Sequence, residues 1–125
     1  MRKEYDFSKG KRGPVQLRDV SPMGYDRAMR VEKTEEYGAW IDGLKDIAGR
    51  ARILMRVDRL IHGNPGAHRH LTHGVSELKI DIGPGYRVAY TQRGDRLLLL
   101  LAGGDKATQS KDIAKAIRLA QAFGE

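Results

Sequence analysis

The sequence predicts a single α+β domain, because helical patterns, strand patterns and a final helical pattern occupy separate blocks along the chain. Its 125 residues are enough for one hydrophobic core. Two stretches carry most of the prediction. Charged and apolar residues alternate over residues 75–82 before a Gly-Pro-Gly turn, which is typical of a hairpin. The run Leu97–Leu101 is apolar at every position, which indicates a strand buried on both faces.

The first 26 residues differ in composition from the rest of the chain. They combine charge with chain-breaking glycine and proline and show no sustained hydrophobic periodicity. We therefore interpret residues 1–26 as an N-terminal arm that is extended or partly disordered, and residues 27–125 as the folded domain.

Two helices are predicted at the start of the domain, after a short strand over residues 28–32. Thr34 is suited to cap the first helix, in which apolar residues recur at helical spacing over residues 37–44. The second helix runs from Ile47 to Ile61, and Gly63 suits its C-terminal cap. The short connection between them predicts an antiparallel helix hairpin.

A loop rich in glycine, proline and histidine is predicted over residues 62–73, followed by a meander and a last helix. The three strands of the meander are predicted over residues 75–82, 86–92 and 96–102. The last helix is predicted over residues 108–123, with alanine and isoleucine on its apolar face.

Composition indicates an anionic partner. The formal net charge of +7 favours nucleic acid, with an acidic protein or a membrane surface as alternatives. The chain has no cysteine, which excludes disulfides, zinc–thiolate sites and cysteine nucleophiles and fits a reducing cytoplasm. No stretch approaches the roughly 20 apolar residues of a membrane span, and the charged N-terminus lacks a secretory apolar region. We therefore expect a cytoplasmic protein with no membrane partner.

The hairpin concentrates charge on one face. Glu77, Lys79 and Asp81 alternate with apolar residues, so the charged side chains point one way and the apolar ones the other. After the turn Gly83-Pro84-Gly85, Arg87 lies close to the charged face. Such a cluster suits the binding and cleavage of a phosphodiester. The alternatives are a solvated strand face and a structural ion pair between Arg87 and Glu77 or Asp81.

Two further groups of residues are candidates for binding. Arg52, Arg56 and Arg59 form a basic stripe on the second helix, which is either a solvated face or a track for a nucleic-acid backbone. The histidines are four in number, and their spacing over residues 62–73 matches no strong zinc pattern. We therefore expect no metal site and no cofactor. Gly103-Gly104-Asp105-Lys106 also lacks the spacing of a Walker phosphate loop.

Six motifs occur in one order between Met29 and Ala120, and together they point to a known family. They are Lys33–Tyr37 with Trp40, Arg50–Leu54, Gly74–Ile80, Gly83–Val88, Leu98–Leu100 and Gly103–Lys106. In this order they resemble the RelE/ParE superfamily of toxins from bacterial toxin–antitoxin modules. The resemblance is greatest to the HigB-like addiction module killer proteins, and it rests mainly on Gly-Pro-Gly-Tyr-Arg followed by Gly-Gly-Asp-Lys.

The resemblance implies both a fold and a function. The implied fold has two N-terminal helices packed on one side of a small antiparallel sheet, plus a C-terminal helix. The implied function is that of a type II toxin with a cognate antitoxin as partner. RelE- and HigB-type toxins are endoribonucleases that cut messenger RNA on the ribosome, whereas ParE-type toxins inhibit DNA gyrase without catalysis. Fold does not choose between these activities, and a non-toxic basic interaction module is a third alternative.

The resemblance also implies roles for individual residues. The RNA 2′-hydroxyl would attack the phosphate without a metal. Arg87 matches the RelE arginine that contacts the scissile phosphate, and Lys79 matches a basic residue of the preceding strand. Glu77 stands where RelE has a lysine, which suggests a carboxylate base. Lys106 stands where RelE has an arginine, to stabilise charge or help protonate the leaving oxygen.

The remaining assignments concern RNA contacts and one departure from the family. We assign RNA contacts to four residues: Arg52, Arg56, Arg59 and Tyr86. The tyrosine near the start of the last RelE helix has no counterpart here, where Gln109, Ser110 and Asp112 stand instead. The departure leaves proton transfer without the group that RelE would provide.

Overall fold

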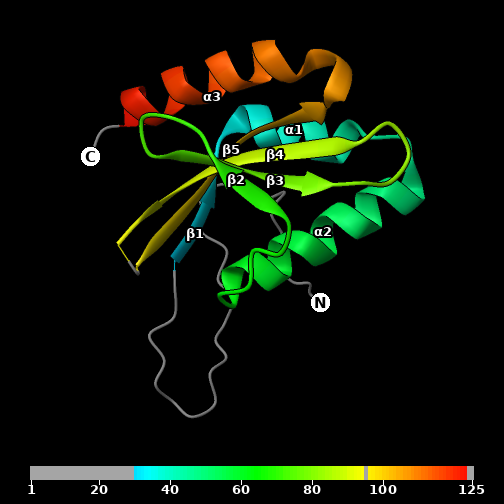
Figure 1. Cartoon of the computed structure of the whole chain (residues 1–125), viewed down its shortest axis with the longest axis horizontal. Helices are drawn as coiled ribbons and strands as arrows, with labels where there is room; N and C mark the ends of the chain where they lie inside the picture. The colour runs from blue at the N-terminus through cyan, green and yellow to red at the C-terminus, as the bar shows by residue number, and fades with distance from the viewer. Residues whose placement is uncertain (1–29, 95, 124–125) are drawn as a thin grey trace.

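A mixed β-sheet forms the centre of the computed structural model, which describes residues 30–94 and 96–123. Within those residues the sheet has five strands, in the spatial order β1-β5-β4-β3-β2 (Figure 1). The strands are β1 (Arg30–Lys33), β2 (His68–His70), β3 (Val75–Ile80), β4 (Tyr86–Arg93) and β5 (Leu97–Asp105). β1 pairs with β5 in parallel, and all other neighbours are antiparallel.

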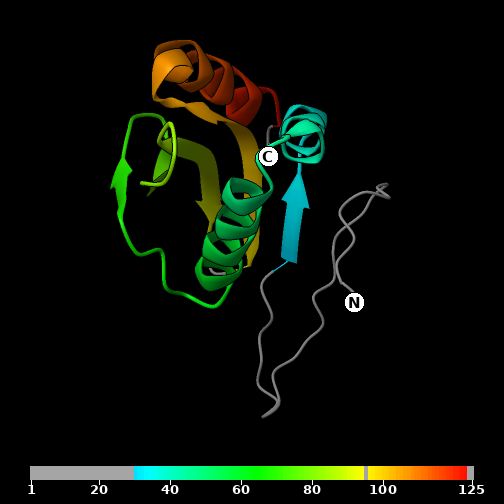
Figure 2. The same ribbon diagram turned by 90° about the vertical axis from the view of Figure 1, so that its right-hand side faces the viewer.

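Helices cover both faces of this sheet. α1 (Glu35–Gly43) and α2 (Ile47–Ile61) pack on one face, and α3 (Gln109–Phe123) packs on the other after the short 3-10 helix η1 (Lys106–Thr108). Figures 1 and 2 show α2 and α3 on opposite sides of the strands. The core is therefore divided into two clusters, with β5 buried between them.

The expected architecture of two N-terminal helices on a small antiparallel sheet is wrong. β1 precedes the helices and adds a parallel edge to the meander, and β2 extends the opposite edge. The chain is held against β5 because the Thr34 N–H donates to Leu100 O at 3.0 Å and the Thr34 hydroxyl donates to Leu101 O at 2.6 Å. Val31 contributes to the core beside them, with 1% of its surface exposed.

The helix signals in the sequence operate as predicted. Thr34 Oγ1 caps α1 by accepting from the Tyr37 N–H at 3.0 Å. Asp46, which we did not predict as a cap, caps α2 in the same way by accepting from the Gly49 N–H at 3.0 Å. The predicted bounds of the second helix, 47–61, are those of α2, and Gly63 follows it with a left-handed φ of +93°.

The leucine run is buried on both faces, as predicted for a central strand. Leu98 and Leu100 face α1 and α2, whereas Leu99 and Leu101 face α3. A register shift opposite Ala89 and Tyr90 lets two consecutive residues of β5 face α3. The three strands of the meander are confirmed, but β2 lies inside the stretch that we expected to be a loop.

Two expectations fall at the limits of the described chain. The N-terminal arm, residues 1–26, and the predicted start of the domain at residue 27 lie outside the described residues. Among residues 30–94 and 96–123, every helix is too short or too polar to cross a bilayer.

Candidate functional site

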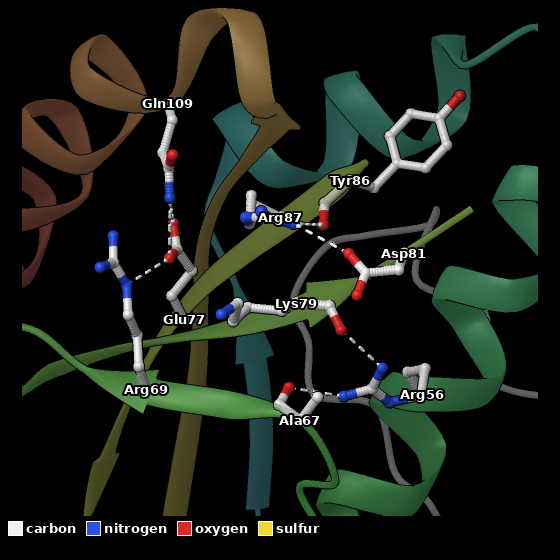
Figure 3. A network of polar contacts seen from close by, with 9 residues as sticks. All are labelled: Arg56, Ala67, Arg69, Glu77, Lys79, Asp81, Tyr86, Arg87 and Gln109. Carbon is white, nitrogen blue, oxygen red and sulfur yellow. Dashed lines mark hydrogen bonds and ion pairs between the residues drawn. The ribbon is translucent and has the colours of Figure 1, made fainter. Parts of the chain in front are cut away.

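The strand alternation separates the hairpin into an apolar face and a charged face. Leu78 and Ile80 enter the core beneath α2, so Glu77 and Lys79 point to the opposite face, on which α3 lies. The register pairs Lys79 with Arg87, and Arg87 in turn with Gly104 of β5. The two cations therefore stand side by side on neighbouring strands (Figure 3).

Lys106 joins this end of the sheet. Asp105 pairs with Tyr86, and Lys106 follows directly as the first residue of η1. A Cβ added at Gly85 would lie 3.2 Å from Lys106 Cδ, so the lysine methylenes cover that glycine. Asp105 Oδ1 fixes the strand exit by accepting from the N–H groups of Ala107 and Thr108, at 2.9 and 3.2 Å. Three sequence-predicted cations, Lys79, Arg87 and Lys106, are thus brought to one end of the sheet.

Arg87 is a buried cation whose hydrogen-bonding capacity is only partly used. Its exposed fraction is 8%. Nη1 donates to Tyr86 O at 3.1 Å and lies 3.8 Å from a carboxylate oxygen of Asp81, whose side chain is 80% exposed. The buried Nε has no hydrogen-bond partner among the described residues. Burying such a donor unpaired is unfavourable, and a phosphate with its bidentate geometry is the ligand that a guanidinium suits.

Glu77 is buried inside a network rather than presented to solvent. Only 1% of its surface is exposed. Oε1 accepts from Arg69 Nε at 3.0 Å, and both carboxylate oxygens accept from Gln109 Nε2 at 3.0 Å. The network joins β2, β3 and the first residue of α3 (Figure 3). We expected Glu77 to carry a proton on an open face, and we did not anticipate Arg69 because β2 itself was not predicted.

Tyr86 faces away from the cations. It packs in the core against α1 and α2, and its hydroxyl donates to Asp46 Oδ2 at 2.7 Å. That hydrogen bond, with burial and the nearby Asp46 charge, raises the pKa of Tyr86 to about 12. The bond from Tyr86 and the Gly49 N–H lower the pKa of Asp46. The structure therefore does not bring Tyr86 to Arg87, and strict strand alternation over residues 86–87 is the signal that separates them.

Comparison with known proteins places the chain in a family. The profile described as "Phage derived protein Gp49-like (DUF891)" matches residues 39–123. The chain belongs to the Gp49-like family. A protein of Haemophilus influenzae described as uncharacterized is 41% identical over 96 residues, which cover 77% of this chain and 97% of that protein. No solved structure matches the chain. The Gp49-like family is a RelE-like toxin family associated with toxin–antitoxin modules, and it implies an antitoxin as partner.

The basic stripe of this Gp49-like chain divides into structural and accessible parts. Arg56 donates to the carbonyls of Lys79, Pro65 and Ala67 at 2.8, 2.9 and 2.8 Å, and so ties the segment before β2 and the end of β3 to α2. Burial lowers the pKa of Arg56. Arg52 and Arg59 are exposed. Because α2 covers the face opposite α3, the stripe is not brought to Arg87.

The histidines of the Gp49-like chain take local hydrogen bonds. His68 Nδ1 lies 2.7 Å from Gly66 O, and His70 Nδ1 lies 2.8 Å from Ser76 Oγ. The rings of His68 and His70 meet edge to face at 5.4 Å between centroids. Within the part of the chain that the structure describes, no three His, Cys, Asp or Glu side chains converge as ligands of a metal ion.

Proposed function

We propose that this Gp49-like chain is a HigB-like toxin of a type II module, a metal-independent endoribonuclease that cuts ribosome-bound messenger RNA in the cytoplasm. One observation carries the proposal. Arg87 is 8% exposed and its Nε lacks a partner among the described residues, yet it stands beside Lys79, and Lys106 lies at the same end of the sheet. A buried arginine with a purely structural role would have all its N–H donors hydrogen-bonded within the protein, whereas a phosphate-binding arginine keeps donors unpaired until the phosphate binds.

The reaction needs positive charge more than it needs new covalent chemistry. The 2′-oxygen forms a bond to phosphorus and loses its proton to water, and the bond from phosphorus to the 5′-oxygen breaks as that oxygen gains a proton from water. Arg87 and Lys79 hold the phosphate and neutralise the charge of the phosphorane. Lys106 balances the charge on the departing oxygen. Because the strand pairing and the Asp105 cap hold these groups in advance, little reorganisation is needed in the transition state.

The positions of the other arginines support contacts outside the cleavage centre. Arg52 and Arg59 are exposed on α2 and are available for an RNA backbone or another acidic surface of the ribosome, whereas Arg56 already serves the fold. The cognate antitoxin is the protein partner, and the charge of +7 is complementary to an acidic one.

Primer extension after induction tests the proposal. We expect new 5′ ends inside translated messages within minutes of induction, and none when translation initiation on the reporter message is blocked. Purified gyrase assayed for supercoiling is the parallel measurement. Intact transcripts with inhibited supercoiling would overturn the nuclease and support the ParE-like alternative. Intact transcripts, active gyrase and normal growth would instead support a non-toxic interaction module.

A further inference from the structure

We propose that Glu77 is a positioning residue rather than a proton carrier: it orients Arg69 as an additional RNA-backbone contact and fastens the start of α3 to the sheet. The inference rests on the proposed function and deepens it. It also assigns a reason for a carboxylate in the middle of a basic face, a place where negative charge alone would weaken RNA binding.

The bonds that Glu77 already makes argue against a proton-transfer role. A general base must come within about 2.6–3.2 Å of the proton that it removes. Glu77 is 1% exposed, and its oxygens accept from Gln109 Nε2 and Arg69 Nε, all at 3.0 Å. Gln109 is the first residue of α3, and its side-chain amide already occupies both carboxylate oxygens. A 2′-hydroxyl would have to displace one or both of these partners to reach the carboxylate.

Arg69 has the donors that Glu77 leaves available. It contacts Glu77 through Nε, and its side chain is 49% exposed. Its two terminal nitrogens make no hydrogen bond to another described residue. They carry four N–H donors, and the bond from Nε restrains the plane in which they lie. A guanidinium held in this way loses less side-chain freedom when it binds a phosphate.

The sheet register arranges the cations in a row. Arg69 pairs with Glu77, and Lys79 lies two residues further on the same face and pairs with Arg87. Neighbours that are offset by two residues on adjacent strands are about 7–8 Å apart, and directly opposite ones are about 5 Å apart. The row thus crosses β2, β3 and β4 with steps that suit successive phosphates of one RNA strand (Figure 3). The bound RNA extends from the scissile phosphate at Arg87 toward β2.

Two measurements on the full chain test this role. The first is the affinity for a labelled, unstructured single-stranded RNA across a range of NaCl concentrations. Each phosphate contact on single-stranded RNA contributes about 0.7 to the slope of log affinity against log salt. Arg69→Gln should make this negative slope shallower by about 0.7. The change should be smaller when Glu77→Gln is already present. Arg118→Gln, an exposed change on α3 with the same loss of charge, should leave the slope unchanged.

The second measurement is the pH profile of ribosome-dependent cleavage. Loss of a general base lowers the rate about 10²–10⁴-fold and removes its limb of the profile. Glu77→Gln, which keeps the size of the side chain, should instead reduce the rate less than 10-fold and leave the profile unchanged in shape. Melting temperatures confirm that each variant is folded.

The outcomes separate the two proposals. An unchanged salt dependence of RNA affinity in Arg69→Gln, or the loss of one limb of the pH–rate profile in Glu77→Gln, overturns this inference. Cleavage of messenger RNA by the wild type would still support the proposed nuclease activity. A wild-type chain that neither binds RNA in a salt-dependent way nor cuts messenger RNA overturns both. A lower slope with an intact pH profile supports both.

Discussion

Replacing Arg87 by methionine should separate function from stability, because activity should fall while stability does not. Methionine retains an unbranched apolar stem that fills the same space between Lys79 and Gly104, but it has no charge and no N–H donors. We expect toxicity and RNA cleavage to fall while the fold is unchanged or becomes more stable.

The magnitudes follow from the contacts of Arg87. The wild-type side chain gains one hydrogen bond to Tyr86 O, about 0.5–1.5 kcal/mol, and a pair with exposed Asp81, about 0.2–1 kcal/mol. Against these stands the burial of an unpaired Nε, which costs about 1–3 kcal/mol. The favourable and unfavourable contributions have midpoints that differ by less than about 0.5 kcal/mol, so the variant should be about as stable as the wild type or slightly more stable. Loss of a preorganised charge contact should reduce cleavage about 10²–10³-fold.

The assay compares Arg87→Met with Arg118→Met, which removes one exposed positive charge from α3. Urea unfolding gives the free energy of unfolding of each variant, and primer extension gives the cleavage. The control should resemble the wild type in both. If Arg87→Met unfolds with a loss of more than about 2 kcal/mol, and cleavage falls only in proportion to the folded fraction, then Arg87 is structural and the reasoning is refuted.

Three further outcomes are expected. Asp81→Asn should tighten RNA binding about 1.4–5-fold, since it frees Arg87 from a pair worth about 0.2–1 kcal/mol, whereas Glu32→Gln, which breaks the pair with Arg30 on β1, should not; equal affinities would show that Asp81 does not compete with phosphate. Gly103→Ala should lower the free energy of unfolding by about 1–3 kcal/mol because its Cβ would overlap the Trp40 ring. Gly43→Ala, with open space around it, should not lower it. A Gly103→Ala protein as stable as the wild type would contradict the close packing. The raised pKa of Tyr86, about 12 against 10.0, means that the folded chain holds this proton more tightly than the unfolded chain. Its contribution to stability is therefore complete below about pH 10 and is lost as the pH rises toward 12. Urea unfolding of Tyr86→Phe should show no such loss, and identical pH profiles of the variant and the wild type would contradict the Asp46 bond.

Local signals account for most of the elements that the sequence predicts correctly. Thr34 and Gly63 act on neighbouring backbone, and the alternation before the Gly-Pro-Gly turn sets both the hairpin and the Lys79–Arg87 pair. The two short strands were harder to predict. β1 was predicted without its partner strand, and β2 was not predicted. β1 has four residues and its partner begins at Leu97. β2 reads His-Arg-His, which has no strand-like alternation of apolar residues, and it forms by pairing with the edge of β3.

In the candidate site, too, contacts set by local spacing are predictable from the sequence, and contacts between distant segments are not. Lys79 and Arg87 are adjacent by simple hairpin geometry, so their proximity is predictable from spacing. The contact between Gln109 and Glu77 joins residues that are 32 positions apart, and no local rule indicates it. Tyr86 is a different case, because alternation next to Arg87 already places it on the opposite face and the resemblance to a motif hid that.

The parallel pairing of β1 with β5 has a consequence for the order in which the chain assembles. β1 and α1 are made first, but their principal neighbour, β5, is completed only at Asp105. The hairpins β3–β4 and β4–β5 close over short turns and should form early, while the first strand waits for a partner some 67 residues away. Lys106 follows immediately after that partner, so a nascent chain acquires the last of its three clustered cations only as its edge strand docks. On the proposed function, the phosphate-binding site therefore stays incomplete during synthesis until nearly the whole domain has emerged.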